Sequence, residues 1–216
     1  MQQPRYHGSL VVAVLTAALA LSGCTADQKA RAYAADDRDE WQQPDRVMEA
    51  LAIAPGQSIA DLGAGGGYFT FRLANTVGPD GRVYAIDVDA DMTERLERIA
   101  RERGASNVSV VLADFDDPKI PELVDLIFTS NTYHHIEGRV AYFERAARYL
   151  RPRGRIAILE YKSQGLFHRI MGHATEAGVM RSELEQAGYT LIADFDFVEQ
   201  QHFLIFDRPS RDPLGI

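Results

Sequence analysis

The sequence has a single cysteine, Cys24, and no cluster of basic residues. One cysteine forms no intrachain disulfide and supplies no cysteine-rich metal site, so a disulfide framework and a zinc ribbon are excluded. Lysine and arginine number 23 against 31 acidic residues, which gives a formal net charge of −8. Because the basic residues are scattered, the positive patch that holds a phosphate backbone is missing. We therefore expect no nucleic-acid partner.

Glycine and proline are present in ordinary amounts, 17 and 9 among 216 residues. Hydrophobic residues make up 46% of the chain and charged residues 25%. Collagen-like and disordered chains have very different compositions, and both classes are excluded. The length predicts one α/β domain with an appendage, because two full domains would be short for this chain.

The appendage is at the amino terminus, where Arg5 and His7 precede an apolar run over residues 10–21. The run is too short to cross a bilayer comfortably, and its layout is typical of a secretory signal peptide. It ends in Leu21-Ser22-Gly23-Cys24, which resembles the lipobox of bacterial lipoproteins. The resemblance implies a signal peptide over residues 1–23, lipid on Cys24 and a tether over residues 24–39. The alternative is a buried helix with a coincidental cysteine.

From residue 40 onward, short apolar runs alternate with helical patterns, which indicates repeated βα units on a parallel sheet. Helical spacing of apolar residues predicts amphipathic helices near residues 92–99 and 140–150. A capping-box pattern at Ser182 predicts a short helix that ends at Gly188. The predicted strands are Ser58–Leu62, Arg82–Asp87, Val108–Leu112, Asp125–Thr129, Arg155–Glu160, Tyr189–Phe195 and Gln201–Phe206.

The last two predicted strands are separated by only a few residues. Such a connection allows antiparallel neighbours but leaves no room for a crossover helix, so the final strand should run against the others. The expected fold class is α/β, with a mostly parallel seven-stranded sheet and helices on both faces. We place the folded domain at residues 40–207 and a flexible tail at residues 208–216.

A glycine loop, Asp61-Leu62-Gly63-Ala64-Gly65-Gly66-Gly67, separates the first predicted strand from a helical pattern at residues 68–77. Glycines in this position let the backbone turn sharply and approach a ligand, with a helix amino terminus behind them. A dinucleotide fingerprint requires a third glycine where this chain has Tyr68, which disfavours NAD.

Acidic side chains follow the next two strands. Asp87 ends the second strand, where a carboxylate accepts hydrogen bonds from ribose hydroxyls. Asp114 and Phe115 follow the third strand, where a carboxylate and an aromatic face suit an adenine ring. These groups share the carboxyl edge of the sheet with the glycine loop, and ligands of open α/β folds bind at that edge.

Together, the segment from Asp61 to Gly67, Asp87 and Asp114 resembles the first three motifs of class I S-adenosylmethionine-dependent methyltransferases. The resemblance implies a Rossmann-like fold with a terminal antiparallel strand and S-adenosylmethionine as the cofactor. By that resemblance, the glycine loop lies against the methionine portion, Asp87 binds the ribose, and Asp114 binds the adenine amino group with Phe115 beside the ring. The alternative is a helix-packing turn with helix caps at the two aspartates.

The fourth strand is followed by Asn131-Thr132-Tyr133-His134-His135. In this superfamily the segment faces both cofactor and substrate, so Asn131 is a candidate cofactor contact. The double histidine resembles small-molecule methyltransferases of the ubiquinone- and menaquinone-biosynthesis type. His135 or His134 is a candidate general base, because imidazole titrates near neutral pH. Tyr133 is a third candidate, and it either lines the pocket or packs. The alternative is that one histidine caps the loop and the other packs.

A second group, Tyr161, His168 and His173, follows the fifth predicted core strand. The two histidines lack the spacing of ligands on one helix face, and we expect no metal site. Related arsenite methyltransferases use several cysteines, which disfavours arsenite as the acceptor here.

The leading hypothesis is a methyltransferase for a small-molecule acceptor, lipid-anchored on the non-cytoplasmic side of a membrane. Because the cofactor is made in the cytoplasm, two alternatives remain: a non-catalytic lipoprotein that binds S-adenosylmethionine or a related nucleoside, and a cytoplasmic enzyme whose signal is not processed.

Overall fold

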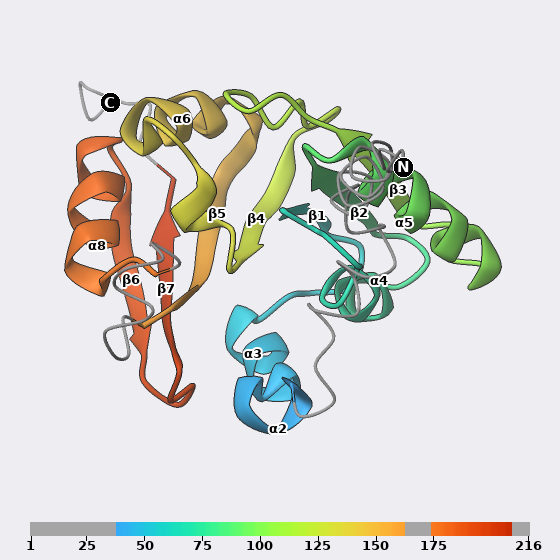
Figure 1. Ribbon diagram of the computed structural model, residues 1–216, viewed down its shortest axis with the longest axis horizontal. Helices are drawn as coiled ribbons and strands as arrows, with labels where there is room; N and C mark the ends of the chain where they lie inside the picture. Colours follow the sequence, from blue (N-terminus) through green and yellow to red (C-terminus); the bar gives the residue numbers. More distant parts are fainter. Residues whose placement is uncertain (1–37, 163–173, 209–216) are drawn as a thin grey trace, which may run out of the picture.

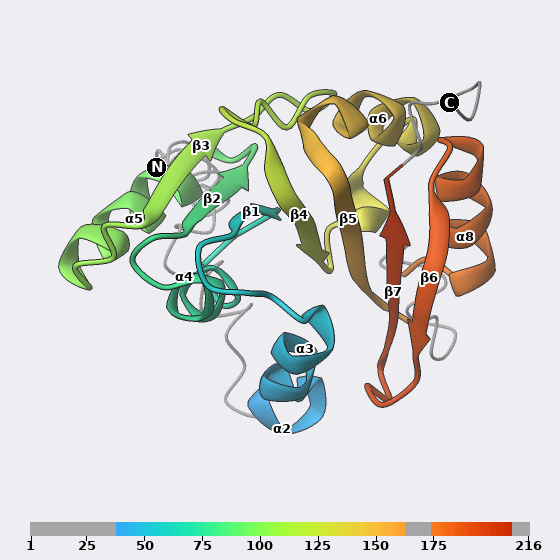
Figure 2. The same cartoon turned by 180° about the vertical axis from the view of Figure 1, so that it is seen from behind.

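The computed structural model describes residues 38–162 and 174–208. They form a seven-stranded sheet in the order β3-β2-β1-β4-β5-β7-β6, covered by helices on both faces (Figures 1 and 2). Cys24, the expected signal peptide, most of the expected tether and the expected tail after Arg208 lie outside the described residues. Within 38–162 and 174–208, no helix is both long and apolar enough to cross a membrane.

All the strands predicted from the sequence are present. The first three have the predicted bounds, and β5 starts at Leu150 rather than at Arg155. The strands are β1 (Ser58–Leu62), β2 (Arg82–Asp87), β3 (Val108–Leu112), β4 (Val124–Ser130), β5 (Leu150–Tyr161), β6 (Thr190–Phe195) and β7 (Gln201–Asp207).

The direction of the last strand is confirmed. β1 pairs in parallel with β2 and β4, and β4 pairs in parallel with β5. β7 lies between β5 and β6 and runs antiparallel to both. The short β6–β7 connection explains this arrangement, because it permits a hairpin and no crossover.

The helices differ from the predictions in several places. The helix expected at residues 68–77 begins at Thr70, and the one expected at residues 140–150 ends at Ala146. Leu150 already belongs to β5. The first helix begins at Arg38, two residues before the expected start of the domain, and the helix expected at Ser182 begins earlier, at Ala177. The capping-box prediction is therefore wrong: Ser182 lies inside the helix, where its carbonyl and hydroxyl accept bonds from Gln186 Nε2. The helices are α2 (Arg38–Gln42), α3 (Pro44–Leu51), α4 (Thr70–Val77), α5 (Ala90–Glu102), α6 (Arg139–Ala146) and α8 (Ala177–Gln186), with short 3₁₀ turns η1 (Tyr133–His135) and η2 (Ala147–Tyr149).

The core has one layer on each side of the sheet. α3 and α4 bury side chains such as Leu51 and Leu73 on one face, with α5 beside them. α6 and α8 bury Phe143 and Leu184 on the other face. β1 lies at the centre and is buried along its whole length. Full burial of each large apolar side chain contributes about 1.5–3 kcal/mol to stability, so the two layers fix the strand ends from which the site is built.

Candidate cofactor and acceptor site

The glycine loop joins β1 to α4 at the carboxyl edge of the sheet. Gly63, Gly65 and Gly67 have positive φ angles of 76°, 51° and 82°, which favour glycine. A Cβ atom at Gly63 would lie 2.0 Å from Thr132 Oγ1, so the loop packs closely against the segment after β4. Among the described residues, the nearest atom that a Cβ at Gly65 would meet is the Gly63 carbonyl oxygen, at 4.0 Å. Within that part of the chain, Gly65 leaves room for a ligand to approach the backbone.

Asp61 stands at the start of this loop and is buried, with 3% of its surface exposed. Its Oδ2 accepts a hydrogen bond from Thr70 Oγ1 at 2.6 Å, which ties β1 to the first turn of α4. Burial raises the pKa of Asp61 to about 6, and the Thr70 hydrogen bond opposes that rise. The buried carboxylate therefore fixes the glycine loop by holding the start of α4 against the end of β1.

Asp87 connects the end of β2 to the loop. Its Oδ2 accepts a bond from the Gly65 backbone N–H at 2.8 Å, and its Oδ1 accepts one from the Asp89 N–H at 3.0 Å. A carboxylate has about four lone-pair positions, so two remain for hydroxyl donors of a ligand. The structure therefore places Asp87 beside the glycine loop, where a ribose could reach both.

The end of β3 carries the groups expected at the adenine. Asp114 forms an ion pair with Lys119 at 2.7 Å, and its side chain is 57% exposed. Phe115 is 80% exposed, and Leu112 and Val88 are also exposed although both are apolar. Exposed apolar side chains next to a polar loop are typical of a ligand surface. These three side chains are therefore candidate contacts for the adenine ring.

Asn131 adopts a positive φ of 55° directly after β4. Its Oδ1 accepts a bond from Gln201 Nε2 at 2.5 Å, and Gln201 Oε1 accepts one from Gln42 Nε2 at 2.9 Å. Both glutamines are fully buried. Sequence reasoning missed Gln42 and Gln201, since they lie 159 positions apart and neither belongs to a motif.

His134 is paired with the buried carboxylate of Glu160. The Nδ1 atom lies 2.8 Å from Glu160 Oε1, and only 5% of the His134 side chain is exposed. Backbone N–H groups of His134 and Tyr161 also donate to Glu160, at 3.2 and 2.8 Å. Three donors therefore satisfy a fully buried carboxylate. Such a partner fixes the orientation and the tautomer of an imidazole.

The structure gives the two adjacent histidines different environments. His135 is exposed, and its ring centre lies 4.0 Å from that of His134. The sequence alone gave no basis for choosing between them, since the glutamate partner is 26 residues away. The carboxylate contact favours His134 as the candidate base.

Of the two interpretations of Tyr133, lining a pocket or packing, the geometry favours packing, because the side chain lies in the core. It is fully buried and stacks on Phe143 with ring centres 5.5 Å apart. Its hydroxyl donates to Glu183 at 2.7 Å, and Glu183 is also bound by Arg139. Burial raises the pKa of Tyr133, as does its hydrogen bond to Glu183. A neutral, enclosed phenol in this position holds η1 against α8.

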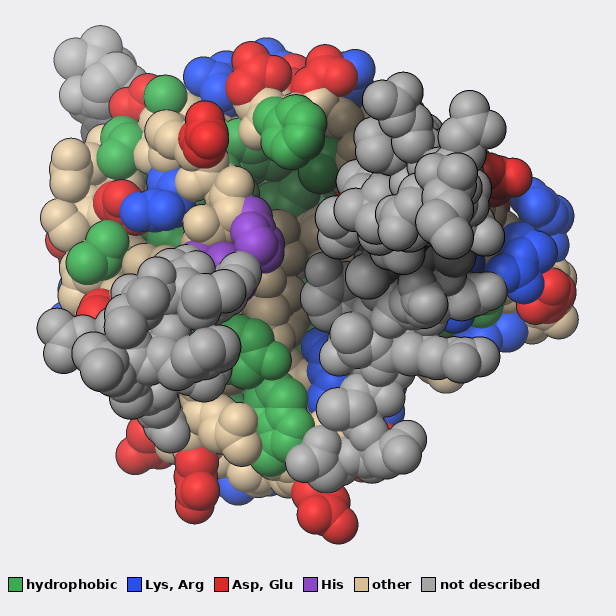
Figure 3. Space-filling model, viewed as in Figure 1, with side chains coloured by type: hydrophobic (Ala, Val, Ile, Leu, Met, Phe, Trp, Pro, Cys, Tyr) green, Lys and Arg blue, Asp and Glu red, His purple; other side chains and the backbone are tan. Residues whose placement is uncertain are grey.

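A cavity of about 550 Å³ adjoins η1 and the start of α6. His134 and Ile136 contribute to its wall, and the Arg139–Glu183 pair faces it from α6 and α8. Histidine side chains lie on the wall of a hollow in the face shown in Figure 3, with hydrophobic side chains above and below them. The cavity has the mixed apolar and polar lining of a small-molecule site.

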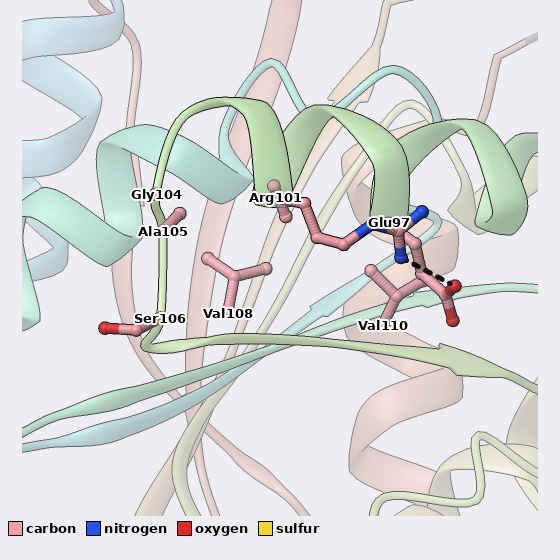
Figure 4. A pocket seen from close by; sticks show the side chains of 8 residues that line it. Glu97, Arg101, Gly104, Ala105, Ser106, Val108 and Val110 are labelled. Atoms are coloured by element: carbon pink, nitrogen blue, oxygen red, sulfur yellow. Dashed lines mark ion pairs between the residues drawn. The ribbon is translucent and has the colours of Figure 1, made fainter.

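A second cavity, of about 350 Å³, lies between α5 and the edge strand β3 (Figure 4). It is lined by residues between Glu97 and Val110, among them Ala100, Arg101 and Val108. Arg101 pairs with Glu97 at 3.5 Å along the helix. This cavity does not include the glycine loop or the histidines, and we assign the candidate site to the carboxyl edge instead.

An aromatic stack connects α2 to the end of β5. Trp41 stacks on Tyr161 with ring centres 5.9 Å apart. His168 and His173, the other members of the second sequence group, lie outside the described residues. Within the described ranges, no group of three or more His, Cys, Asp or Glu side chains is arranged to hold a metal ion.

Comparison with known proteins agrees with this geometry. Residues 53–202 match the methyltransferase domain family. Over 114 residues the chain is 36% identical to nocamycin O-methyltransferase of Saccharothrix syringae, covering 52% of this chain and 41% of that protein. Over 108 residues it is 32% identical to arsenite methyltransferase of Halobacterium salinarum, covering 50% and 28%. The chain thus spans less than half the length of these two relatives.

The fold also matches solved structures. A SAM-dependent methyltransferase from Aquifex aeolicus superposes with a TM-score of 0.76 at 24% identity, covering 83% of this chain and 97% of the other. The seven-stranded order and the antiparallel β7 are part of that shared fold. The chain belongs to the methyltransferase domain family, and its fold is the Rossmann-like fold of class I S-adenosylmethionine-dependent methyltransferases.

Proposed function

We propose that this protein transfers a methyl group from S-adenosylmethionine to a small-molecule acceptor, using the carboxyl edge of β1, β2, β3 and β4. One observation carries the proposal: the Asp87 carboxylate accepts the Gly65 N–H at 2.8 Å, which joins a nucleoside-binding carboxylate to the glycine loop in a chain of the methyltransferase family. When bound, the cofactor supplies an electrophilic methyl group on a sulfonium.

The residues present fit such a cofactor. The backbone at Gly65 is open to a ligand, and Asp87 retains acceptor positions for two ribose hydroxyls. The exposed side chains of Val88, Leu112 and Phe115 offer an apolar surface for the adenine. In-line methyl transfer depends mostly on positioning, so these contacts carry much of the catalytic effect.

His134 is the proposed proton acceptor for acceptors that must lose a proton. Its Nδ1 atom is held by Glu160, and the residue contributes to the wall of the cavity beside η1. Glu160 stabilises the imidazolium that forms when His134 takes a proton, as a buried carboxylate does in other base-orienting pairs. Glu160 is thus a positioning residue, because it acts through His134.

The acceptor is proposed to be a small organic molecule with an acidic O–H, N–H or C–H group. The double histidine after β4 and the resemblance to relatives named as O- and C-methyltransferases support this class. Arsenite is disfavoured despite one relative's name, because the chain has one cysteine and that residue is the proposed lipid attachment site.

The cofactor proposal is tested by calorimetric titration of S-adenosylmethionine into the full-length protein, with NAD and ATP as controls. Selective micromolar binding is expected. Asp87→Ala should weaken binding by about 1.5–3 kcal/mol, the range for hydrogen bonds to charged groups. A folded wild-type protein that binds none of the three ligands would overturn the proposal.

The catalytic proposal is tested by a methyl-transfer screen against phenols, hydroxyquinones and amines. His134→Ala should lower kcat with little change in cofactor affinity, and Glu160→Gln should lower kcat and shift the pH profile. His135→Ala is the matched control for the adjacent imidazole. Binding without turnover across the whole screen would favour a non-catalytic nucleoside-binding protein.

We further propose that the chain is anchored by lipid on Cys24 to the non-cytoplasmic side of a membrane. The apolar run at residues 10–21 and the Leu21–Cys24 motif support this location. Metabolic labelling with radioactive palmitate should mark the wild-type protein and leave Cys24→Ser unlabelled. Absence of label in both would favour a cytoplasmic enzyme with an unprocessed signal.

A further inference from the structure

Three amide side chains form a hydrogen-bonded row from α2 to the end of β4. Gln42 Nε2 donates to Gln201 Oε1 at 2.9 Å, and Gln201 Nε2 donates to Asn131 Oδ1 at 2.5 Å. Both glutamines are fully buried. Gln42 ends α2, Gln201 begins β7, and Asn131 directly follows β4. We call these three residues the amide row.

Arg38 determines the direction of every hydrogen bond in the amide row. The guanidinium lies over the Tyr68 ring, 3.7 Å from its centre, and its Nε donates to Gln42 Oε1 at 2.5 Å. The two ends of an amide group have the same shape, so their partners decide which end is the oxygen. Because a guanidinium has donors only, Gln42 presents its oxygen to Arg38 and its nitrogen to Gln201. The same rule orients Gln201 and then Asn131, since a reversed row would set two buried donors against each other.

The amide row therefore ends in a hydrogen-bond donor. Asn131 Oδ1 is occupied by Gln201, which leaves Nδ2 at the other end of the group. In residues 38–162 and 174–208, no acceptor lies within hydrogen-bond distance of Nδ2. Asn131 is half-buried and has a φ of 55°, a strained conformation of the kind found at functional sites. An amide held at one end and open at the other is a preorganised donor.

The position of Asn131 assigns this donor to the methyl acceptor. The bond to Gln201 draws its side chain toward β5 and β7, and its backbone N–H donates to the Leu159 carbonyl, one residue before Glu160. Glu160 also holds His134. The groups proposed for the nucleoside follow β1, β2 and β3, on the other side of β4. Asn131 thus shares the side of the sheet that carries the proposed base.

We propose that Asn131 Nδ2 donates a hydrogen bond to an oxygen atom of the methyl acceptor and stabilises the negative charge on that oxygen. This inference rests on the proposed function. His134 takes the O–H proton, and an electron pair of the oxyanion, or of a carbon conjugated with it, forms the bond to the methyl carbon. The electron pair of the broken carbon–sulfur bond stays on sulfur, and His134 returns the proton to water.

The inference narrows the methyl acceptor to phenols, enols and hydroxyquinones. An oxygen atom keeps a further lone pair for Asn131 while it is attached to the reacting centre. An amine nitrogen uses its only lone pair in the attack, so it offers Asn131 nothing but N–H donors. Such a contact would place donor against donor, which costs free energy in a site shielded from water.

The test compares two planar probes of one shape, 4-nitrophenol and 4-nitroaniline. Each is titrated by absorbance at pH 8 into the full-length protein with S-adenosylhomocysteine bound. The wild-type protein should bind 4-nitrophenol about 10- to 100-fold more tightly, the range for a hydrogen bond to a charged group. Asn131→Gly suits the positive φ and removes the amide, so most of this preference should be lost. Asn131→Asp replaces the donor by an oxygen and should reverse the preference.

Gln201→Glu tests the amide row itself. A carboxylate accepts from both neighbours, so Asn131 would turn to donate to it and would present Oδ1 to the methyl acceptor. The preference for 4-nitrophenol should then fall as in Asn131→Gly. Gln186→Glu is the matched control, because it makes the same change at an exposed position on α8. It should keep the wild-type preference.

The outcomes separate this inference from the proposed function. Equal binding of the two probes by a wild-type protein that binds S-adenosylhomocysteine would overturn the inference alone. An unchanged preference in Asn131→Gly, with folding verified by thermal unfolding, would also overturn it. Loss of S-adenosylhomocysteine binding in Asn131→Gly with an unchanged preference would instead make Asn131 a cofactor contact. A wild-type protein that does not bind S-adenosylhomocysteine would overturn the proposed function as well.

Discussion

Replacing Asp61 by asparagine should stabilise the folded protein at neutral pH while weakening the cofactor site. The carboxyl group is 3% exposed, and burial raises its pKa from the ordinary value of 3.8 to about 6. The ionised form is therefore less favourable in the folded chain than in the unfolded chain. Asparagine keeps an oxygen that can accept the Thr70 hydrogen bond and removes the buried charge.

The sign and size of the effect come from proton linkage. Between pH 3.8 and about 6 the folded state binds more protons than the unfolded state, so stability falls as pH rises through this interval. The loss is complete about one pH unit above the folded-state pKa of about 6. A rise of about two pKa units corresponds to about 3 kcal/mol, because each unit is 1.36 kcal/mol. We expect Asp61→Asn to recover up to about 3 kcal/mol at pH 7.5 and progressively less toward pH 4.5.

Urea unfolding of both proteins at several pH values measures this difference directly. Asp125→Asn is the control, because Asp125 accepts bonds from the Ser58 N–H at 2.8 Å and from Arg151 at 2.6 Å. Losing that ion pair should lower stability at pH 7.5. An Asp61→Asn protein that is less stable than wild type at pH 7.5, or a gain that does not depend on pH, would refute the reasoning. The affinity for S-adenosylmethionine should fall in the same variant.

Gly67→Ala should destabilise the protein by about 2–4 kcal/mol in urea unfolding, because the added Cβ would lie 2.6 Å from Leu96 Cδ1 and 2.7 Å from Phe71 Cε2 at a φ of 82°. An unchanged free energy of unfolding would mean that the loop rearranges around the added methyl group without cost. Tyr133→Phe should cost about 1 kcal/mol through the lost bond to Glu183 and leave kcat unchanged. A large fall in kcat with unchanged stability would instead indicate that Tyr133 takes part in catalysis.

Local patterns explain why much of the fold was predictable. Each buried strand is an apolar run bounded by turn residues, and burial on both faces of a parallel sheet produces such runs. β1, β2 and β3 have the predicted bounds for this reason. α8 was placed wrongly because a capping pattern is a weak local signal, whereas the burial of Met180 and Leu184 extends the helix across Ser182.

The sequence by itself determined the parallel sheet, the terminal hairpin, the glycine loop, and the positions of Asp87 and Asp114 after the next two strands. These features depend on neighbouring residues and on where strands end. Only the tertiary structure decided which histidine meets Glu160, that Tyr133 is a core residue, and that Arg38 reaches the Tyr68 ring. These three outcomes depend on contacts between segments far apart in the chain. Their geometry depends on how the strands and helices pack, and no local sequence pattern predicts it.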